Sequence, residues 1–150
     1  MPKNIIPDSS CLILLEKISH LEILNNLYNR IVITPTVSDE YGLPVPEWIH
    51  IQPIKNRQYQ TLIQASVDPG EASVIALAIE IGGLLVLDDL KARKLAANYH
   101  LDYTGTLGIL IEAKRSGHIQ SFKAILNRIR QTNFHMTEAL ERKLLDLSEE

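Results

Sequence analysis

Five acidic residues stand next to predicted ends of strands or starts of helices, where their side chains could act together on a phosphate-containing substrate. They are Asp8, Glu40, Glu71, Asp88 and Asp89. Carboxylate oxygens without a nearby cluster of His or Cys suit Mg²⁺ or Mn²⁺ rather than zinc. Such ions can hold a phosphate oxygen, activate water and stabilise the leaving oxygen in phosphodiester hydrolysis. The residue types therefore point to metal-dependent phosphodiester chemistry.

The segment from Pro69 to Arg93 would bring two of these acidic groups together. Asp68 is predicted to cap a helix that ends at Gly82-Gly83, and Leu84–Leu87 forms a short buried strand. The helix spans roughly 18 Å, at 1.5 Å per residue. The strand climbs back over roughly 16 Å. Glu71 and the pair Asp88-Asp89 should therefore lie at the same edge.

The rest of the chain alternates between predicted strands and helices. Strands are expected over Asn4–Pro7, Ile31–Thr34, Trp48–Ile54 (at the sheet edge) and Leu101–Tyr103. Expected helix caps include Ser9 or Ser10, Thr36, Ser121 and Thr137. The pattern predicts one domain over residues 1–150, with a three-layer α/β fold and a mostly parallel sheet. Ligands of such sheets sit at the carboxyl ends of the strands, where all five acids should converge.

Each acid also has a purely structural interpretation. Glu71 could complete a capping box, which is the favoured interpretation of that residue taken alone. Glu40 could merely complement a helix dipole. Asp89 could cap the next helix and leave Asp88 as the ligand, or the two could exchange roles. Asp8 is harder to explain structurally, because a charge that closes a buried strand usually has a partner.

Four more residues are candidates for contacts with a substrate. Arg93 lies one helical turn past Asp89, where it could hold a phosphate or pair with Asp89, and the ion pair is slightly favoured. Thr104 and Thr106 flank Gly105 at a strand end, so one hydroxyl could reach the site, although helix capping explains Thr106 equally well. Ser9, beside Asp8, is the fourth candidate. The five histidines show no ligand-like spacing.

The distribution of charge along the sequence indicates which class of substrate the protein could bind. The net charge of −3 hides a basic segment, residues 91–130, with eight Lys and Arg against two acids; its +6 leaves −9 for the remainder. This asymmetry suits an enzyme acting on a polyanion, although solvated helix faces explain it equally well.

No apolar run reaches the roughly 18 residues of a membrane span. We expect the thiol of the single cysteine, Cys11, to be buried. A chain with one cysteine also fits the reducing environment of the cytoplasm.

With these residues assembled, the sequence resembles the PIN-domain proteins, in particular a small prokaryotic branch. The resemblance extends from Ile5 to about Gly117, over four short motifs: Asp8-Ser9-Ser10, Gly70-Glu71-Ala72, Leu87-Asp88-Asp89 to Ala92-Arg93, and Gly105-Thr106-Leu107-Gly108-Ile109-Leu110. It implies a Rossmann-like α/β/α sandwich and a metal-dependent site for cleaving single-stranded RNA. Many small members are toxins, held inactive by an antitoxin protein and often dimeric.

The resemblance also implies individual roles. Asp8 matches the first acid of the family, Glu40 the second, Glu71 the third, and Asp88 or Asp89 the fourth. Two positions depart from the pattern, because many active members have Asp where Glu71 stands and Thr where Leu87 stands. The longer Glu71 could alter the position of the metal.

Three functional hypotheses follow. The leading one is a Mg²⁺- or Mn²⁺-dependent ribonuclease, as the toxin of a toxin–antitoxin pair. The second is a PIN-like module that binds RNA or a protein without hydrolysis, through the basic segment. The third, a phosphorylated signalling receiver, ranks lower because such domains carry an acid pair after the first strand, where this chain has Asp8-Ser9.

Overall fold

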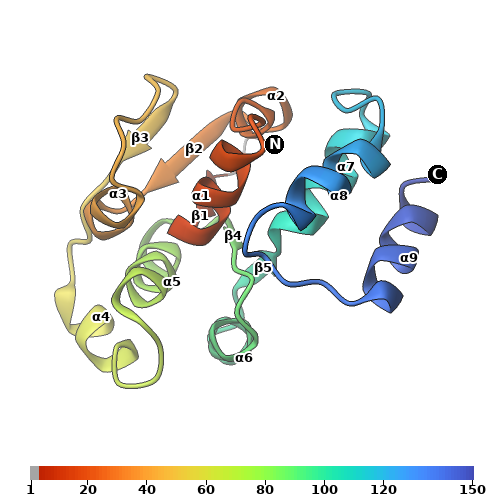
Figure 1. The fold of residues 1–150 in the computed structure, drawn as a ribbon. Helices are drawn as coiled ribbons and strands as arrows, with labels where there is room; N and C mark the ends of the chain where they lie inside the picture. Colours follow the sequence, from red (N-terminus) through yellow and green to blue (C-terminus); the bar gives the residue numbers. More distant parts are fainter. Residues whose placement is uncertain (1–3) are drawn as a thin grey trace.

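A computed structural model describes residues 4–150 and shows five parallel strands flanked by helices (Figure 1). The sheet order is β3-β2-β1-β4-β5, and each neighbouring pair runs parallel. The strands are β1 (Asn4–Pro7), β2 (Arg30–Ile33), β3 (Ile49–Ile51), β4 (Leu84–Val86) and β5 (Asp102–Thr104). The α/β/α architecture expected from the alternating pattern is confirmed.

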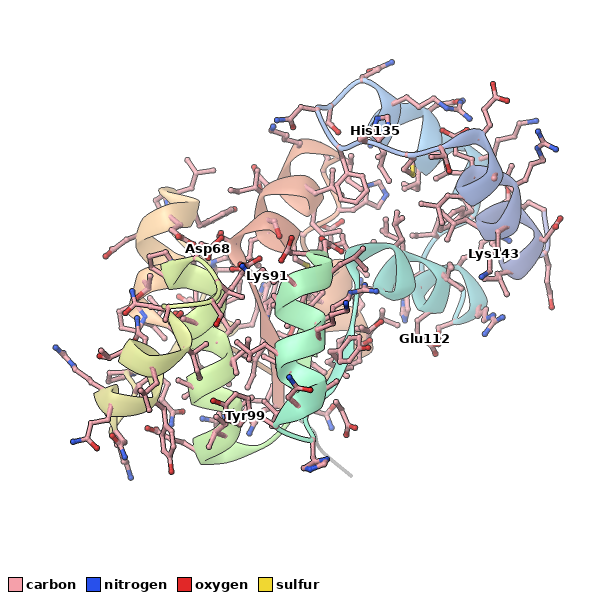
Figure 2. All side chains as sticks on the ribbon, turned by 90° about the horizontal axis from the view of Figure 1, so that it is seen from below. Asp68, Lys91, Tyr99, Glu112, His135 and Lys143 are labelled. Atoms are coloured by element: carbon pink, nitrogen blue, oxygen red, sulfur yellow. The ribbon has the colours of Figure 1, made fainter. Side chains whose placement is uncertain are left out.

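The helices lie on both sides of this sheet. They are α1 (Ser9–Lys17), α2 (Ile23–Leu27), α3 (Pro35–Tyr41), α4 (Arg57–Ile63), α5 (Pro69–Ile81), α6 (Leu90–Asn98), α7 (Thr106–Arg115), α8 (Phe122–Arg130) and α9 (Glu138–Leu147). Helices α5 and α6 lie on one face, in front of the strands in Figure 2, and α1, α2 and α7 lie on the other (Figure 1). No helix within residues 4–150 is long and apolar enough to cross a membrane.

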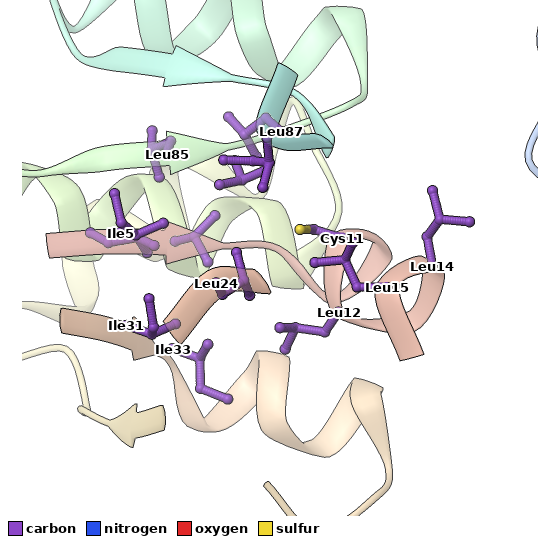
Figure 3. Packing of buried hydrophobic residues seen from close by; sticks show 14 of the residues in the cluster. Ile5, Cys11, Leu12, Leu14, Leu15, Leu24, Ile31, Ile33, Leu85 and Leu87 are labelled. Carbon is purple, nitrogen blue, oxygen red and sulfur yellow. The ribbon is translucent and has the colours of Figure 1, made fainter. Parts of the chain in front are cut away.

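Buried apolar side chains surround the strands at the middle of the sheet, including β1 and β4 (Figure 3). Ile5 and Ile6 of β1 and Leu85 of β4 are fully buried. The strands of a parallel sheet covered on both faces read as continuous apolar runs, and these do. Helix α5 is apolar almost all round and packs against both central strands, which holds its first turn beside their carboxyl ends.

Several helix starts differ from those expected. Asp8, rather than Ser9 or Ser10, caps α1, by accepting a hydrogen bond from the Ser9 amide. Thr34, rather than Thr36, caps α3, because Pro35 takes the first helical position, for which its fixed φ is suited. The predicted caps Asp68, Ser121 and Thr137 are confirmed. The edge strand β3 is shorter than expected and ends at Ile51, before Pro53 with its missing N–H.

Candidate active site

Asp8 and Asp88 follow the two central strands, on the carboxyl edge of the sheet. Strands β1 and β4 pair in parallel with Pro7 opposite Val86, and the Asp8 amide donates to the Val86 carbonyl at 3.1 Å. The strand order makes this the topological switch point: β2 and β3 lie on one side of β1, and β4 and β5 lie on the other. Open parallel sheets bind ligands at such a point.

Asp8 is buried and surrounded by other acids. The residue is 5% exposed, and its carboxylate accepts a hydrogen bond of 2.7 Å from the Ser9 amide. Burial raises the pKa of Asp8 from 3.8 to about 7, with additional repulsion from Asp68, Glu71 and Glu40, and the Ser9 amide offsets only part of this rise. The ionised form of Asp8 therefore lacks, among the described residues, a neighbouring positive charge that would stabilise it.

Glu71 caps a helix and also belongs to the acidic group. It forms the capping box with Asp68: its amide donates to Asp68 Oδ1 at 2.8 Å, and its Oε1 accepts from the Asp68 amide at 3.2 Å. Burial raises the pKa of Glu71 to about 7, and repulsion from Asp68 and Asp89 adds to the effect. The structural interpretation is thus correct, but it does not account for a buried carboxylate facing two other acids.

Glu40, on α3, is exposed and reaches the same edge over Gly70. The Ser9 hydroxyl donates to Glu40 Oε1 at 2.9 Å. A Cβ atom built on Gly70 would lie 2.1 Å from that oxygen. Gly70 sits inside α5 with ordinary helical geometry, so what its missing side chain provides here is room for the Glu40 carboxylate.

Asp88 and Asp89 have different neighbours. Both Asp88 oxygens accept hydrogen bonds from Thr106, from the amide at 2.8 Å and from the hydroxyl at 2.6 Å. Asp89 Oδ2 accepts from the Ala92 amide at 3.0 Å and so caps α6. This matches the alternative in which Asp89 caps the helix. Thr106 is not the cap of α7; Gly105 holds that position, and the Thr106 hydroxyl orients Asp88 instead.

Arg93 does not form the favoured ion pair with Asp89. None of the ion pairs within residues 4–150 involves any of the five acids. The Arg93 Nε donates to the Leu87 carbonyl at 2.6 Å, and its guanidinium lies over the Tyr103 ring, 5.6 Å from the centroid. The Asp89 carboxylate is meanwhile used as a cap, so both partners of the expected pair are engaged elsewhere.

Thr104, a candidate for contact with a substrate, is not bonded to the acidic group. Its Oγ1 lies against Gly108, and no hydrogen bond in the described part of the chain joins it to an acid.

The basic residues of the segment 91–130 are divided among α6, α7 and α8. Two of them pair with acids of the C-terminal region, Lys114 with Glu150 and Arg130 with Glu141. The basic residues that directly follow the acid pair are Lys91, Arg93 and Lys94 of α6.

The donor chemistry of this edge fits a hard divalent cation, although the ligand set is not fully assembled. Within residues 4–150, no three Asp, Glu, His or Cys side chains are close enough to hold a metal ion as they stand. The oxygens nevertheless come from neighbouring elements, and the pKa values of Asp8 and Glu71 are raised, mainly by burial and in smaller part by repulsion from the other acids. The residue types at this edge thus suit a hard divalent cation, but the described residues do not form an assembled ligand set.

Sequence reasoning missed several contributors to this site. The sequence predicts only a capping role for Asp68, but its charge also acts on Asp8 and Glu71. Figure 2 shows why, since Asp68 at the start of α5 and Lys91 at the start of α6 lie at the same end of these helices, opposite Tyr99. Gly105 is close-packed like Gly70: a Cβ there would lie 2.1 Å from Arg93 Nη2 and 3.0 Å from Asp88 Oδ1. The expected burial of Cys11 is confirmed.

We predict that Gly70→Ala weakens Mn²⁺ binding without harming the fold. The added methyl group would displace the exposed Glu40 carboxylate, whereas alanine is a better helix former than glycine. Titration calorimetry should show affinity reduced roughly tenfold or more, as when the surroundings of a metal ligand are disturbed. Gly108→Ala is the matched control, because it displaces only Thr104. Unchanged Mn²⁺ affinity in Gly70→Ala would contradict a contribution of the Glu40 carboxylate to Mn²⁺ binding.

We also predict that stability without metal falls as pH rises from about 4 to about 7. Because the folded state raises the pKa of Asp8, it holds a proton that the unfolded state releases near pH 4, and this contribution is lost by about pH 7. The loss is at most a few kcal/mol, at about 1.4 kcal/mol per pKa unit. Urea unfolding in chelator should show a smaller decrease for Asp8→Asn, which retains a good helix cap. If the free energy of unfolding fell equally with pH in the two proteins, the raised pKa of Asp8 would be contradicted.

Comparison with known proteins agrees with the fold and the motifs. A family model described as a PIN domain matches residues 4–150. No curated protein gives a significant match to the chain. PIN domains are generally nucleases and typically use divalent metals. The resemblance inferred from the motifs is thus confirmed, and the chain belongs to the PIN-domain family.

Proposed function

We propose that this protein is a Mg²⁺- or Mn²⁺-dependent endoribonuclease that hydrolyses phosphodiester bonds of single-stranded RNA. The supporting observation is the group of acids at the carboxyl edge, where Asp8 and Glu71 have pKa values of about 7 and no ion pair within residues 4–150 neutralises them. A divalent cation would relieve both the burial cost and the mutual repulsion.

Asp8, Glu71, Asp88 and Asp89 would hold the cation, with Glu40 at the exposed side. When bound, the ion supplies Lewis-acid polarisation of the phosphodiester and a lower pKa for the attacking water. The chain's own contribution is orientation: Ser9 donates to Asp8 through its amide and to Glu40 through its hydroxyl, and Thr106 donates twice to Asp88. These bonds keep the acceptor oxygens directed at the edge.

A polyanionic substrate is supported by the cations beside this edge. Lys91, Arg93 and Lys94 lie on α6 directly after the acid pair. Arg93 is held by the Leu87 carbonyl, which places a guanidinium near Asp88 without an ion pair to consume its charge. Arginine suits phosphate through its planar set of donors. The choice of RNA rests on the motifs shared with the small prokaryotic members.

The same motifs support a biological setting. We infer a toxin held inactive by an antitoxin protein, acting as a homodimer in the cytoplasm. The exposed Leu43, Ile51 and Leu62 offer apolar surface that a protein partner could bury. Co-purification with a neighbouring small protein that abolishes cleavage would support this setting. A monomer insensitive to every such protein would remove the toxin assignment and leave the nuclease assignment standing.

A second candidate function is a PIN-like module that binds RNA or protein without hydrolysis. Two observations favour it: within the described residues the acids do not already form a ligand set, and Glu71 stands where many active members have Asp. This alternative requires RNA binding that persists in Asp8→Asn and no cleavage by the wild-type protein with either metal. The following experiment separates it from the nuclease.

We predict that Asp8→Asn abolishes metal-dependent cleavage of end-labelled single-stranded RNA. The substitution removes one buried charge yet preserves the α1 cap. Wild type should cut with Mn²⁺ or Mg²⁺ and stop with chelator, and the variant should fall to the chelator baseline with an unchanged circular dichroism spectrum. Asp102→Asn is the control, since this exposed acid begins β5 at the opposite edge. Equal cleavage by cleanly purified Asp8→Asn would refute the proposal.

A further inference from the structure

An open pocket lies beside the acidic edge, between α6 and the edge strand β5. Its volume is about 420 Å³, within the roughly 300–1,000 Å³ usual for small-ligand clefts. It is lined by Leu90, Lys91, Arg93, Lys94 and Tyr103. Leu90 follows Asp89 directly, and Arg93 binds the carbonyl just before Asp88. The pocket therefore starts where the acidic edge ends.

The pocket combines exposed apolar groups with positive charge. Leu90 is 75% exposed and Tyr103 is 40% exposed, although both are large and apolar. Arg93 lies over one face of the Tyr103 ring and leaves part of the ring open to solvent. The remaining two lining residues are lysines, and no acid is among the five. This is an aromatic platform surrounded by cations.

We propose that this pocket receives an unpaired nucleobase of the substrate strand, stacked against Tyr103 and Leu90, with Lys91 and Lys94 on the flanking phosphates. Proteins that bind single strands combine positive charge along the backbone with aromatic side chains under the bases. A base in a duplex is paired and stacked, so the pocket selects single-stranded segments. The inference rests on the proposed function, because it makes the pocket a subsite next to the cleaved phosphate.

The occupant is a nucleotide rather than an acidic peptide for reasons of position and shape. A carboxylate side chain would satisfy the lysines but would leave Tyr103 and Leu90 exposed. A nucleotide supplies both a flat apolar surface and a phosphate charge, as the lining requires. The next phosphate along the RNA strand would then lie near Arg93 and Asp88, where the proposed cleavage takes place.

Fluorescence anisotropy with a short labelled single-stranded RNA, in chelator and at low salt, tests this proposal. We expect Tyr103→Ala to bind about fivefold to a hundredfold more weakly, the range for removing one base–aromatic stack. Tyr103→Phe should retain the wild-type affinity because it retains the ring. Tyr59→Ala is the matched control, since Tyr59 is equally exposed at 40% but lies on α4. Thermal melts of all three variants should match wild type.

Abasic substitutions locate the stacked base. Removing one base at a time should weaken wild-type binding most at a single position, and Tyr103→Ala should lose that dependence. Unchanged RNA affinity in Tyr103→Ala, equal weakening by Tyr103→Phe, or absence of any RNA binding would overturn the proposal. Tyr103-dependent binding of a labelled acidic peptide, with RNA binding unaffected, would likewise overturn it and assign the pocket to a protein.

The two proposals fail independently. Because the binding assay is run in chelator, it does not require cleavage. Tyr103-dependent binding without metal-dependent cleavage would remove the nuclease and keep the pocket as a nucleic-acid site. Cleavage that disappears in Asp8→Asn, together with unchanged RNA affinity in Tyr103→Ala, would keep the nuclease and remove the pocket.

Discussion

The parallel pairing of β1 with β4 is the contact on which the rest of the site depends. It places Asp8 beside the segment that carries Asp88, through Pro7 opposite Val86 and the bond from the Asp8 amide to the Val86 carbonyl. Helix α5 packs on the same two strands and adds Glu71, while β5 pairs with β4 and adds Thr106. One central register thus controls acids that are distant in sequence.

The acids at this edge also hold the helices in place. Asp8 caps α1, Asp68 and Glu71 cap α5 together, and Asp89 caps α6. Each helix N-terminus carries a partial positive charge, so the carboxylates are partly stabilised by the helices that they cap. This stabilisation is incomplete, since the pKa values of Asp8 and Glu71 remain near 7. The residual negative charge is what a cation would neutralise.

Local patterns predicted most of the architecture and the edge at which the acids gather. The alternation of apolar runs with Gly and Pro signals located the strands and helices, and parallel topology then assigned Asp8, Glu71 and Asp88 to the same edge of the sheet. The interactions that sequence could not predict are long-range ones. Examples are Arg93 turning to Tyr103 rather than Asp89, Ser9 bonding to Glu40, and the close approach of Glu40 to Gly70. Spacing along the chain carries no information about such contacts.

Localising Mn²⁺ in a crystal of the wild-type protein is the most direct test of a metal site at the carboxyl edge, because the anomalous scattering of Mn²⁺ identifies the ion without reference to activity. We expect an anomalous peak at the carboxyl edge, bounded by Asp8 and Asp88 together with Glu71 or Asp89, with the carboxylates rotated toward it. Saturating Mn²⁺ with no peak at this edge, and the carboxylates placed as they are here, would show that these acids do not form a metal site.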